Sequence, residues 1–184
     1  MKIGFQGDIG SNAEEATGKF VDILKNNKLE QVALITSKNV VSALLDKKIK
    51  YGVMAIRNSI IGEVIETKNA INEKIEMIDS IEIDIHHCLF AKNENSLLQY
   101  VASHIQALQQ TEKTRAKILK DVQEVECIDT ALAAKMLYDG EYSENYAVIC
   151  RKNAGNIYGL KLIAENIEDD KSNKTTFGLF RLKD

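Results

Sequence analysis

Short apolar segments alternate with segments of helical periodicity along most of this chain, and this alternation limits the folds it can adopt. Lys2–Gln6 has the length and composition of a strand. A helix is predicted from about Asn12, because Ala16 and Phe20 would share one face. Repeated strand–helix units are typical of α/β folds with mostly parallel sheets and helices on both faces. The other predicted strands are Gln31–Thr36, Tyr51–Ile56, Tyr100–Ser103, Glu124–Cys127, Tyr146–Cys150, Leu160–Glu165 and Thr176–Leu182, and the other predicted helices begin near Ser37 and Gly62 or span Gln106–Lys120 and Thr130–Tyr138.

The segment Ile75–Phe90 departs from this pattern. It is long and rich in isoleucine, and Ile81 and Ile83 alternate with acidic residues, as in a strand. We interpret it as a strand that passes from one lobe to another. The 184 residues then form a single domain, with residues 1–78 and 160–184 in the first lobe and 79–159 in the second. We expect a central cleft between the lobes, since open α/β folds bind ligands where strand ends and helix N-termini converge.

The composition excludes several classes of protein. The net charge is -3 and the basic residues are scattered, which argues against nucleic-acid binding. The apolar runs are too short to span a bilayer. The N-terminal sequence MKIGFQGDIG lacks the long apolar core of a secretory signal, so we expect a cytoplasmic protein.

The cysteines and the adjacent histidines do not suggest a metal site. Cys88, Cys127 and Cys150 lie far apart in the sequence, each in an apolar strand-like stretch, which favours reduced, buried thiols. His86 and His87 would point to opposite faces of a strand, so a shared metal ion is not expected.

Four polar clusters fall at the ends of predicted strands. The first is Gly7–Asn12, whose two glycines permit a tight turn before a helix N-terminus, an arrangement that suits an anion. The second is Arg57–Ser59, where a guanidinium, an amide and a hydroxyl could clamp a carboxylate. Each also has a simpler interpretation, as a tight turn or as a polar turn that caps a helix.

The third and fourth clusters lie in the second half of the chain. In the third, His104 is expected either to titrate near neutral pH or to cap the helix that carries Gln109 and Gln110. The fourth, Asn173–Phe177, has hydroxyls that could donate hydrogen bonds to a leaving group, or could simply decorate a strand edge. None of the clusters contains a Ser–His–Asp triad, a Cys–His pair or a set of metal ligands.

The order and spacing of the four clusters carry a family resemblance. The first strand and turn read IGFQGDIGSNA, where the prephenate dehydratase family has a strand followed by GPxGTYS. Residues 52–67 read GVMAIRNSIIGEVIET, and the family motif is GVVPIENSxxGxVxxT. Residues 103–111, 129–134 and 167–177 read SHIQALQQT, DTALAA and IEDDKSNKTTF, and the family motifs are SHPQALxQC, STAxAA and IxDxxxNxTRF. The chain therefore resembles this family over essentially its whole length.

The resemblance implies a fold like the type II periplasmic binding proteins, with two α/β lobes around a cleft. It also implies the conversion of prephenate to phenylpyruvate, water and carbon dioxide, without a cofactor, because aromatisation of the ring drives the reaction. By position, Thr175 matches the catalytic threonine that assists the leaving hydroxyl. The other residues that the resemblance places in the site are Asn58 and Gln110, as catalytic residues, and Gly10, Ser11, Arg57, Ser59, Ser103, His104, Thr130, Thr176 and Phe177, as substrate-binding residues.

Several positions depart from the family pattern. Arg57 stands where the family has glutamate, and Thr176 where it has arginine. Ala55 and Asp8 replace prolines, and Ala13 replaces a serine. The exchanges at 57 and 176 would partly compensate each other if the two side chains share a site.

The resemblance also bears on regulation and assembly. The sequence contains neither the phenylalanine-sensing ACT domain usual in the family nor a fused chorismate mutase, so we expect no allosteric inhibition by phenylalanine. A homodimer or higher homo-oligomer is expected. Two alternatives to the dehydratase remain: a diverged relative that acts differently on prephenate or arogenate, for example by decarboxylation, and a non-catalytic protein that binds a small carboxylate.

Overall fold

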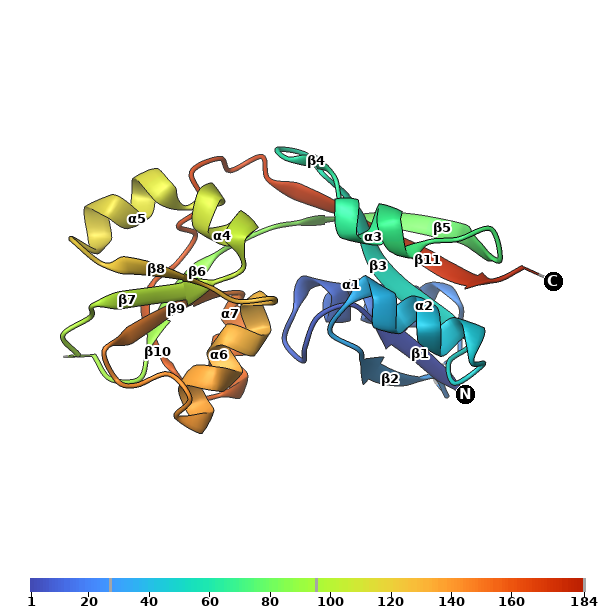
Figure 1. Cartoon of the computed structure of the whole chain (residues 1–184), viewed down its shortest axis with the longest axis horizontal. Coiled ribbons are helices and arrows are strands. Elements are labelled where there is room, and N and C mark those ends of the chain that lie inside the picture. The colour runs from blue at the N-terminus through green and yellow to red at the C-terminus, as the bar shows by residue number, and fades with distance from the viewer. Residues whose placement is uncertain (27, 95, 184) are drawn as a thin grey trace. The chain divides into compact units, whose positions relative to one another are not determined.

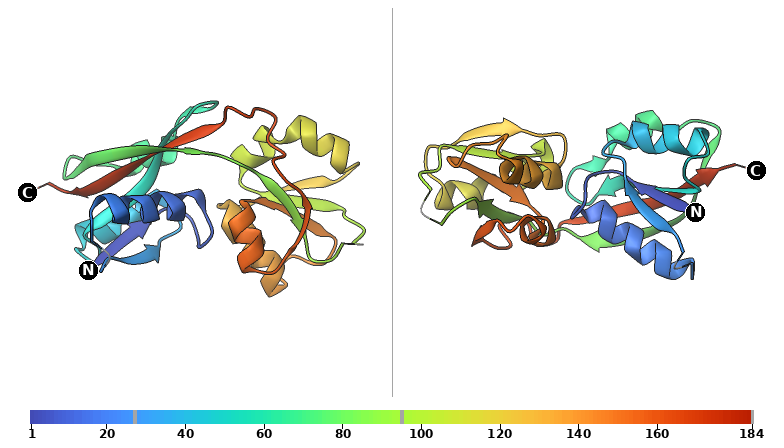
Figure 2. Two further views of the ribbon diagram at one scale, coloured as in Figure 1. Left: turned by 180° about the vertical axis from the view of Figure 1, so that it is seen from behind. Right: turned by 90° about the horizontal axis from the view of Figure 1, so that it is seen from below.

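The computed structural model describes residues 1–26, 28–94 and 96–183, drawn in Figures 1 and 2. The chain divides into two compact units, each built on its own sheet. Unit 1 contains Met1–Asp8, Asn12–Ile85 and the segment from Ser172 onward, and unit 2 contains Ile9–Ser11 and His86–Lys171.

Unit 1 is built on a six-stranded sheet. Its elements are β1 (Lys2–Phe5), α1 (Asn12–Ile23), β2 (Glu30–Ala33), α2 (Ser37–Leu45), β3 (Tyr51–Asn58), β4 (Gly62–Glu63), α3 (Ile65–Ala70), β5 (Ile75–Asp84) and β11 (Lys174–Leu182). The strand order is β2-β1-β3-β11-β5, and β4 pairs with β3. β1 pairs in parallel with β2 and β3, whereas β11 pairs antiparallel with β3 and β5. Figure 1 shows β11, in red, running beside β5, in green.

Helices cover both faces of the unit 1 sheet. Val53 packs in a core cluster with Phe20 of α1, whereas the next residue, Met54, packs in a second cluster with Leu44 of α2. Successive side chains of a strand point to opposite faces, so α1 and α2 lie on opposite sides of the sheet. The predicted alternation of strands and helices thus has its expected result, a layered α/β unit.

Unit 2 is built on a five-stranded sheet. Its elements are β6 (Cys88–Ala91), β7 (Tyr100–Ser103), α4 (Ile105–Gln110), α5 (Glu112–Ile118), β8 (Gln123–Glu126), α6 (Thr130–Asp139), β9 (Tyr146–Cys150), α7 (Lys152–Ile157) and β10 (Lys161–Ala164). The strand order is β10-β6-β9-β7-β8. Phe90 packs with α6 and α7 on one face, and its neighbour Leu89 packs with α4 on the other.

Both sheets are mixed, which corrects the expectation of mostly parallel sheets. β7 pairs in parallel with β8 and β9, but β6 pairs antiparallel with β9 and β10. In unit 1 the antiparallel members are β11 and β4. Local periodicity identifies strands and helices, but it does not fix the direction in which strands distant in sequence pair.

The division between the units lies later in the chain than residues 78 and 160. β5 pairs with β11 along its whole length, up to the pair Asp84–Lys174, which keeps it in unit 1. β10 pairs with β6 and therefore belongs to unit 2, and the chain returns to unit 1 at Ser172. The predicted crossing strand Ile75–Phe90 is accordingly two strands, one in each unit.

Some element boundaries differ from the prediction for local reasons. The predicted helix Gln106–Lys120 is two helices, because Thr111 has φ -123° and ψ 5° and ends the first of them. Thr36, not Ser37, caps α2, and its hydroxyl accepts a hydrogen bond from Asn39 N (3.2 Å). The helix predicted near Gly62 begins at Ile65, after β4. α7 was not predicted. None of the helices in the described ranges combines the length and apolar character of a transmembrane span.

Candidate active site

The side chains of Thr175 and Asn58 form a hydrogen-bonded pair in unit 1. The two residues face each other in the antiparallel register of β11 and β3. Asn58 Nδ2 donates to Thr175 Oγ1 (2.9 Å), and both side chains are buried. The structure thus joins two of the three residues that the sequence predicts as catalytic.

Asn58 is held by contacts on both ends of its amide. Its Nδ2 also donates to Asn173 Oδ1 (2.8 Å) and to Lys174 O (3.0 Å). Its Oδ1 accepts from the backbone N–H groups of Ile60 (3.0 Å) and Ile61 (3.2 Å), which fixes the turn after β3. The amide orientation is therefore determined by its surroundings, and the NH2 group faces Thr175.

Asn173 is a member of this network that was not singled out from the sequence. It lies in the cluster Asn173–Phe177, but only its contact with Asn58 shows that its side chain supports the pair. The sequence signal was a polar residue two positions before the catalytic candidate, and the structure shows that this residue is buried. Ser59 adds a backbone tie, since its N–H donates to Lys174 O (2.8 Å) and its hydroxyl accepts from Lys174 N (2.9 Å).

The contact with Asn58 determines which hydrogen bond the Thr175 hydroxyl can still form. A hydroxyl has one proton and two acceptor lone pairs. Because Oγ1 accepts the amide proton of Asn58, the hydroxyl proton of Thr175 is the group that remains to donate. A donor hydroxyl held by a buried amide can stabilise negative charge that develops on a departing oxygen.

Arg57 and Thr176 are cross-strand partners in the same pair of strands. The two departures from the family pattern are therefore neighbours across this strand pair, while their compensation stays a prediction. Arg57 precedes Asn58, and Thr176 follows Thr175. The side chains of Arg57 and Thr176 therefore point to the face of the sheet opposite to that of the Asn58–Thr175 pair. The register shifts between Thr176 and Phe177, and such irregularities re-aim side chains beside a site.

The surroundings of Arg57 are open. Its side chain is exposed, and its register partner on β4 is Glu63. Glu63 binds Lys68 (2.7 Å) instead, and Glu66 accepts from Gln6 Nε2 (2.8 Å) and Ser37 N (2.7 Å). Among the described residues, neither glutamate forms an ion pair with Arg57.

Phe177 and Ala55 have structural contacts that explain their residue types. Phe177 lies on the same strand as Thr175, and its ring packs in the unit 1 core cluster. Ala55, where the family has proline, has a backbone N–H, and this group donates to Gln6 Oε1 (3.1 Å). The proline-to-alanine departure thus creates a donor that the chain satisfies with a glutamine side chain.

Four of the predicted residues lie around β7 and α6 in unit 2. Ser103 is buried, and its hydroxyl donates to Ile149 O (2.6 Å). His104 caps α4, since its Nδ1 accepts from Gln106 N (3.3 Å), so the capping interpretation of this residue is confirmed. Gln110 is buried at the end of α4, and Thr130 begins α6 directly after the capping residue Asp129.

Gln110 is bound by a histidine that the sequence did not identify as part of the site. His87 Nε2 lies 2.8 Å from Gln110 Oε1, and both side chains are buried. Burial lowers the pKa of His87, more than the hydrogen bond with Gln110 and the charge of Glu168 raise it. The ring is therefore neutral at physiological pH, and His86, which is exposed, contacts Glu168 instead.

Glu168 is a buried carboxylate that organises this part of unit 2. It accepts from His87 N (3.0 Å), lies 3.1 Å from His86 Nδ1, and binds Lys171 Nζ (3.2 Å). Burial raises its pKa, but the hydrogen bonds from His87, His86 and Lys171 outweigh burial and hold the pKa below the ordinary 4.5. Its side chain is 1% exposed, so replacement disturbs a packed position.

This depressed pKa predicts a pH-dependent contribution to stability. A carboxylate with a lowered pKa in the folded protein stabilises it above the unfolded pKa, and this contribution is lost as the pH falls through the folded pKa. We therefore expect Glu168→Gln to lower the free energy of unfolding at neutral pH and to flatten its decline below about pH 4.5. Urea unfolding across that range measures the slopes. The control is Glu126→Gln, which removes an exposed carboxylate from β8; equal slopes for wild type and Glu168→Gln would contradict the prediction.

The first predicted cluster contains a glycine that its surroundings require. Gly10 has φ +90°, and a Cβ at this position would come within 2.6 Å of Ala154 Cα of α7. Backbone approach and left-handed conformation therefore both exclude a larger residue. Ser11, which follows, is buried.

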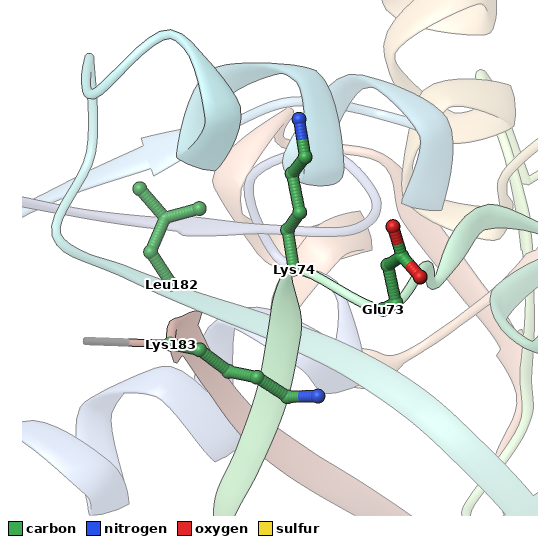
Figure 3. A pocket seen from close by; sticks show the side chains of 4 residues that line it. All are labelled: Glu73, Lys74, Leu182 and Lys183. Atoms are coloured by element: carbon green, nitrogen blue, oxygen red, sulfur yellow. The ribbon is translucent and has the colours of Figure 1, made fainter.

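Two further features are the cysteines and one surface hollow. Cys88 and Cys150 are buried thiols that face each other in the register of β6 and β9, and burial raises the pKa of both. Cys127 is half-buried, not buried as expected. In the described ranges, no group of three His, Cys, Asp or Glu side chains could hold a metal ion. A hollow of about 610 Å³ is lined by Glu73, Lys74, Leu182 and Lys183, at the end of β11 opposite to Thr175 (Figure 3).

Comparison with known sequences identifies relatives of the whole chain. The family model described as prephenate dehydratase matches residues 3–184. A prephenate dehydratase from Methanocaldococcus jannaschii is 34% identical over 176 residues, which cover 95% of this chain and 62% of that protein. Arogenate dehydratase 1 from Petunia hybrida is 28% identical over 180 residues, which cover 96% of this chain and 41% of that protein. The chain thus spans about two fifths to three fifths of these relatives.

Solved structures share the fold. A prephenate dehydratase from Arthrobacter aurescens, solved in complex with L-Phe, has a TM-score of 0.84 at 22% identity and covers 100% of this chain and 61% of its own. A periplasmic substrate-binding protein of an ABC transporter from Coxiella burnetii has a TM-score of 0.56 at 12% identity, over 100% of this chain and 85% of its own. The likeness to periplasmic binding proteins expected from the sequence is confirmed at the level of the fold.

Proposed function

Because the chain belongs to the prephenate dehydratase family, we propose that it converts prephenate to phenylpyruvate, water and carbon dioxide. In this reaction the bond to the ring carboxyl group breaks and its electrons enter the ring. The ring hydroxyl leaves at the same time, and the ring becomes aromatic. Aromatisation supplies the driving force, so no cofactor is required, and the protein has to position the substrate and assist the departing hydroxyl.

The hydrogen bond from Asn58 to Thr175 is the observation that carries this proposal. A hydroxide ion leaves slowly unless it receives a proton or a strong hydrogen bond. Asn58 binds the oxygen of Thr175 and thereby turns the hydroxyl proton toward another acceptor. Thr175 donates this proton toward the leaving oxygen, and a proton from solvent restores the Thr175 hydroxyl. The prephenate dianion and one solvent proton thus give the phenylpyruvate anion, carbon dioxide and water.

Gln110, the third residue predicted as catalytic, and the predicted substrate-binding residues complete the site in this proposal. Gln110 belongs to α4 and His104 caps this helix, and Gly10 and Ser11 belong to the first turn. These residues belong to unit 2, whereas Thr175 belongs to unit 1, and the central cleft that would bring them together stays a prediction. Homo-oligomerisation and a cytoplasmic location stay predictions as well.

The test is direct. Purified protein is incubated with prephenate, and phenylpyruvate is measured by its absorbance in alkali. A parallel incubation with arogenate is followed by the release of phenylalanine, since relatives of this chain are named arogenate dehydratases. Consumption of prephenate without phenylpyruvate would indicate the diverged reaction, and binding of prephenate without turnover would indicate a carboxylate-binding protein.

Arg57 is expected to affect binding more than turnover. Prephenate carries two carboxylates, and an exposed guanidinium attracts a dianion both before and during the reaction. Attraction that is equal in the ground state and the transition state does not raise kcat. Arg57→Glu should therefore raise KM for prephenate and leave kcat equal or higher, and the difference in KM should shrink as salt is added.

The control for this experiment comes from the facing residue. Thr176→Arg in the Arg57→Glu background restores the residue types of the family at two cross-strand positions, where opposite charges are favourable. Unchanged KM in Arg57→Glu would mean that Arg57 is a surface residue that does not contribute to substrate binding. Loss of kcat with unchanged KM would instead place Arg57 in the chemistry.

A further inference from the structure

His87 contacts Gln110 in a way that fixes the direction of the Gln110 amide. The two residues are 23 positions apart, and the atoms in contact are His87 Nε2 and Gln110 Oε1, at 2.8 Å. An amide oxygen only accepts hydrogen bonds, so the ring nitrogen that faces it must carry the proton. The NH2 group of Gln110 then points away from His87, and the side chain acts as a donor on its other side.

Both partners of this bond are held by the segment Glu168–Asp169. The Glu168 carboxylate accepts from His87 N (3.0 Å), and Ile167 N donates to His87 O (2.9 Å). Asp169 N donates to Gln110 O (2.7 Å). The Asp169 carboxylate accepts from Thr114 N (2.8 Å) at the start of α5. These hydrogen bonds hold the backbones of His87 and Gln110 and thus keep the imidazole and the amide at a fixed separation.

We propose that His87 is a positioning residue for Gln110, which it holds with the NH2 group presented to a carboxylate or hydroxyl oxygen of the substrate. This inference rests on the proposed function. A glutamine amide can turn over and present either its oxygen or its nitrogen, and only the nitrogen attracts an anionic substrate. With its proton on Nε2, His87 removes this ambiguity, because the Nε2–H group would face the NH2 group of a turned amide. A side chain that is already oriented loses little freedom when the substrate binds.

A double-mutant cycle tests the role of His87. His87→Phe keeps a ring of similar size and removes the donor, and Gln110→Met keeps the length of the side chain and removes the amide. His87→Phe should lower kcat/KM for prephenate by about 10- to 10²-fold, the scale of a misplaced active-site group. In the Gln110→Met background the same substitution should change kcat/KM by less than about twofold, because nothing is left to position.

The same set of variants provides controls for folding and for side-chain shape. The double variant replaces both buried partners by apolar groups, which is tolerated better than the removal of one partner. His87→Gln places an amide nitrogen near the position of Nε2 and should recover part of the activity lost in His87→Phe. His86→Gln changes the adjacent, exposed histidine and should leave kcat/KM within about twofold of wild type, because the His86 ring contacts Glu168 and it is the His87 ring that contacts the Gln110 amide.

Nuclear magnetic resonance provides a readout that does not depend on turnover. In the wild type, the His87 ring should carry its proton on Nε2, and the side-chain NH2 protons of Gln110 should exchange with water more slowly than in His87→Phe. Equal exchange rates, or an equal effect of His87→Phe in both Gln110 backgrounds, would overturn the inference. A wild-type protein without activity on prephenate would contradict the proposed function, while the exchange rates would still decide the contact.

Discussion

Thr175→Ala is expected to lower kcat for prephenate by about 10²-fold or more, the scale of losing one well-placed catalytic donor. The substitution removes the hydroxyl that donates to the departing oxygen. It does not leave Asn58 without acceptors, because Asn58 Nδ2 also donates to Asn173 Oδ1 and Lys174 O. Stability and substrate affinity should therefore change much less than kcat. Steady-state kinetics with prephenate, together with calorimetric binding, measure the two effects separately.

The matched control for this prediction is Thr175→Ser. Serine keeps a hydroxyl at the same branch point and lacks only the methyl group, so turnover should stay within about tenfold of wild type. If Thr175→Ala has the same kcat as wild type, Thr175 takes no part in the reaction. If both variants lose turnover to the same extent, the methyl group and the packing of β11 matter, and the hydroxyl does not.

Asn58→Asp is expected to reduce kcat by a similar factor, about 10²-fold, and to destabilise the fold. The new carboxylate has the shape of the amide but no N–H, so it faces three acceptors: Thr175 Oγ1, Asn173 Oδ1 and Lys174 O. The hydroxyl of Thr175 would then donate its proton to the carboxylate and not to the leaving oxygen. Buried groups without partners cost about 1–3 kcal/mol each, which chemical denaturation can measure.

The two substitutions should not be additive. If Asn58 acts through Thr175, Asn58→Asp should lower kcat very little in a protein that already carries Thr175→Ala. The free energy of unfolding serves as the internal control, since the loss of the hydrogen bonds to Asn173 Oδ1 and Lys174 O does not depend on Thr175. Independent losses of kcat would show that Asn58 contacts the substrate directly.

Much of the local structure follows from periodicity. The helix from Asn12 and the strand Tyr100–Ser103 begin at the predicted residues, because an amphipathic face or a short apolar run is a property of adjacent residues. The break at Thr111 and the division of Ile75–Phe90 were not predicted. Both depend on the packing of segments that meet only in the folded units.

In the candidate site, too, motifs predict some features and only the folded structure shows the others. Family motifs predict that Asn58 and Thr175 belong to one site, although 117 positions separate them. They do not show that one amide proton joins the two side chains. The motifs miss His87 altogether, since a histidine in an apolar stretch has no local feature that connects it with Gln110.

Periodicity and motifs in a fixed order are sufficient to predict the α/β class, the family and the residue types of the candidate site. Only the folded chain shows the direction of strand pairing, the cross-strand pairing of Arg57 with Thr176, and the orientation of the Asn58 and Gln110 amides. Each of these depends on groups far apart in the chain that contact one another only after folding. An amide in particular has two ends of similar shape, and only its hydrogen-bond partners determine which end faces the substrate.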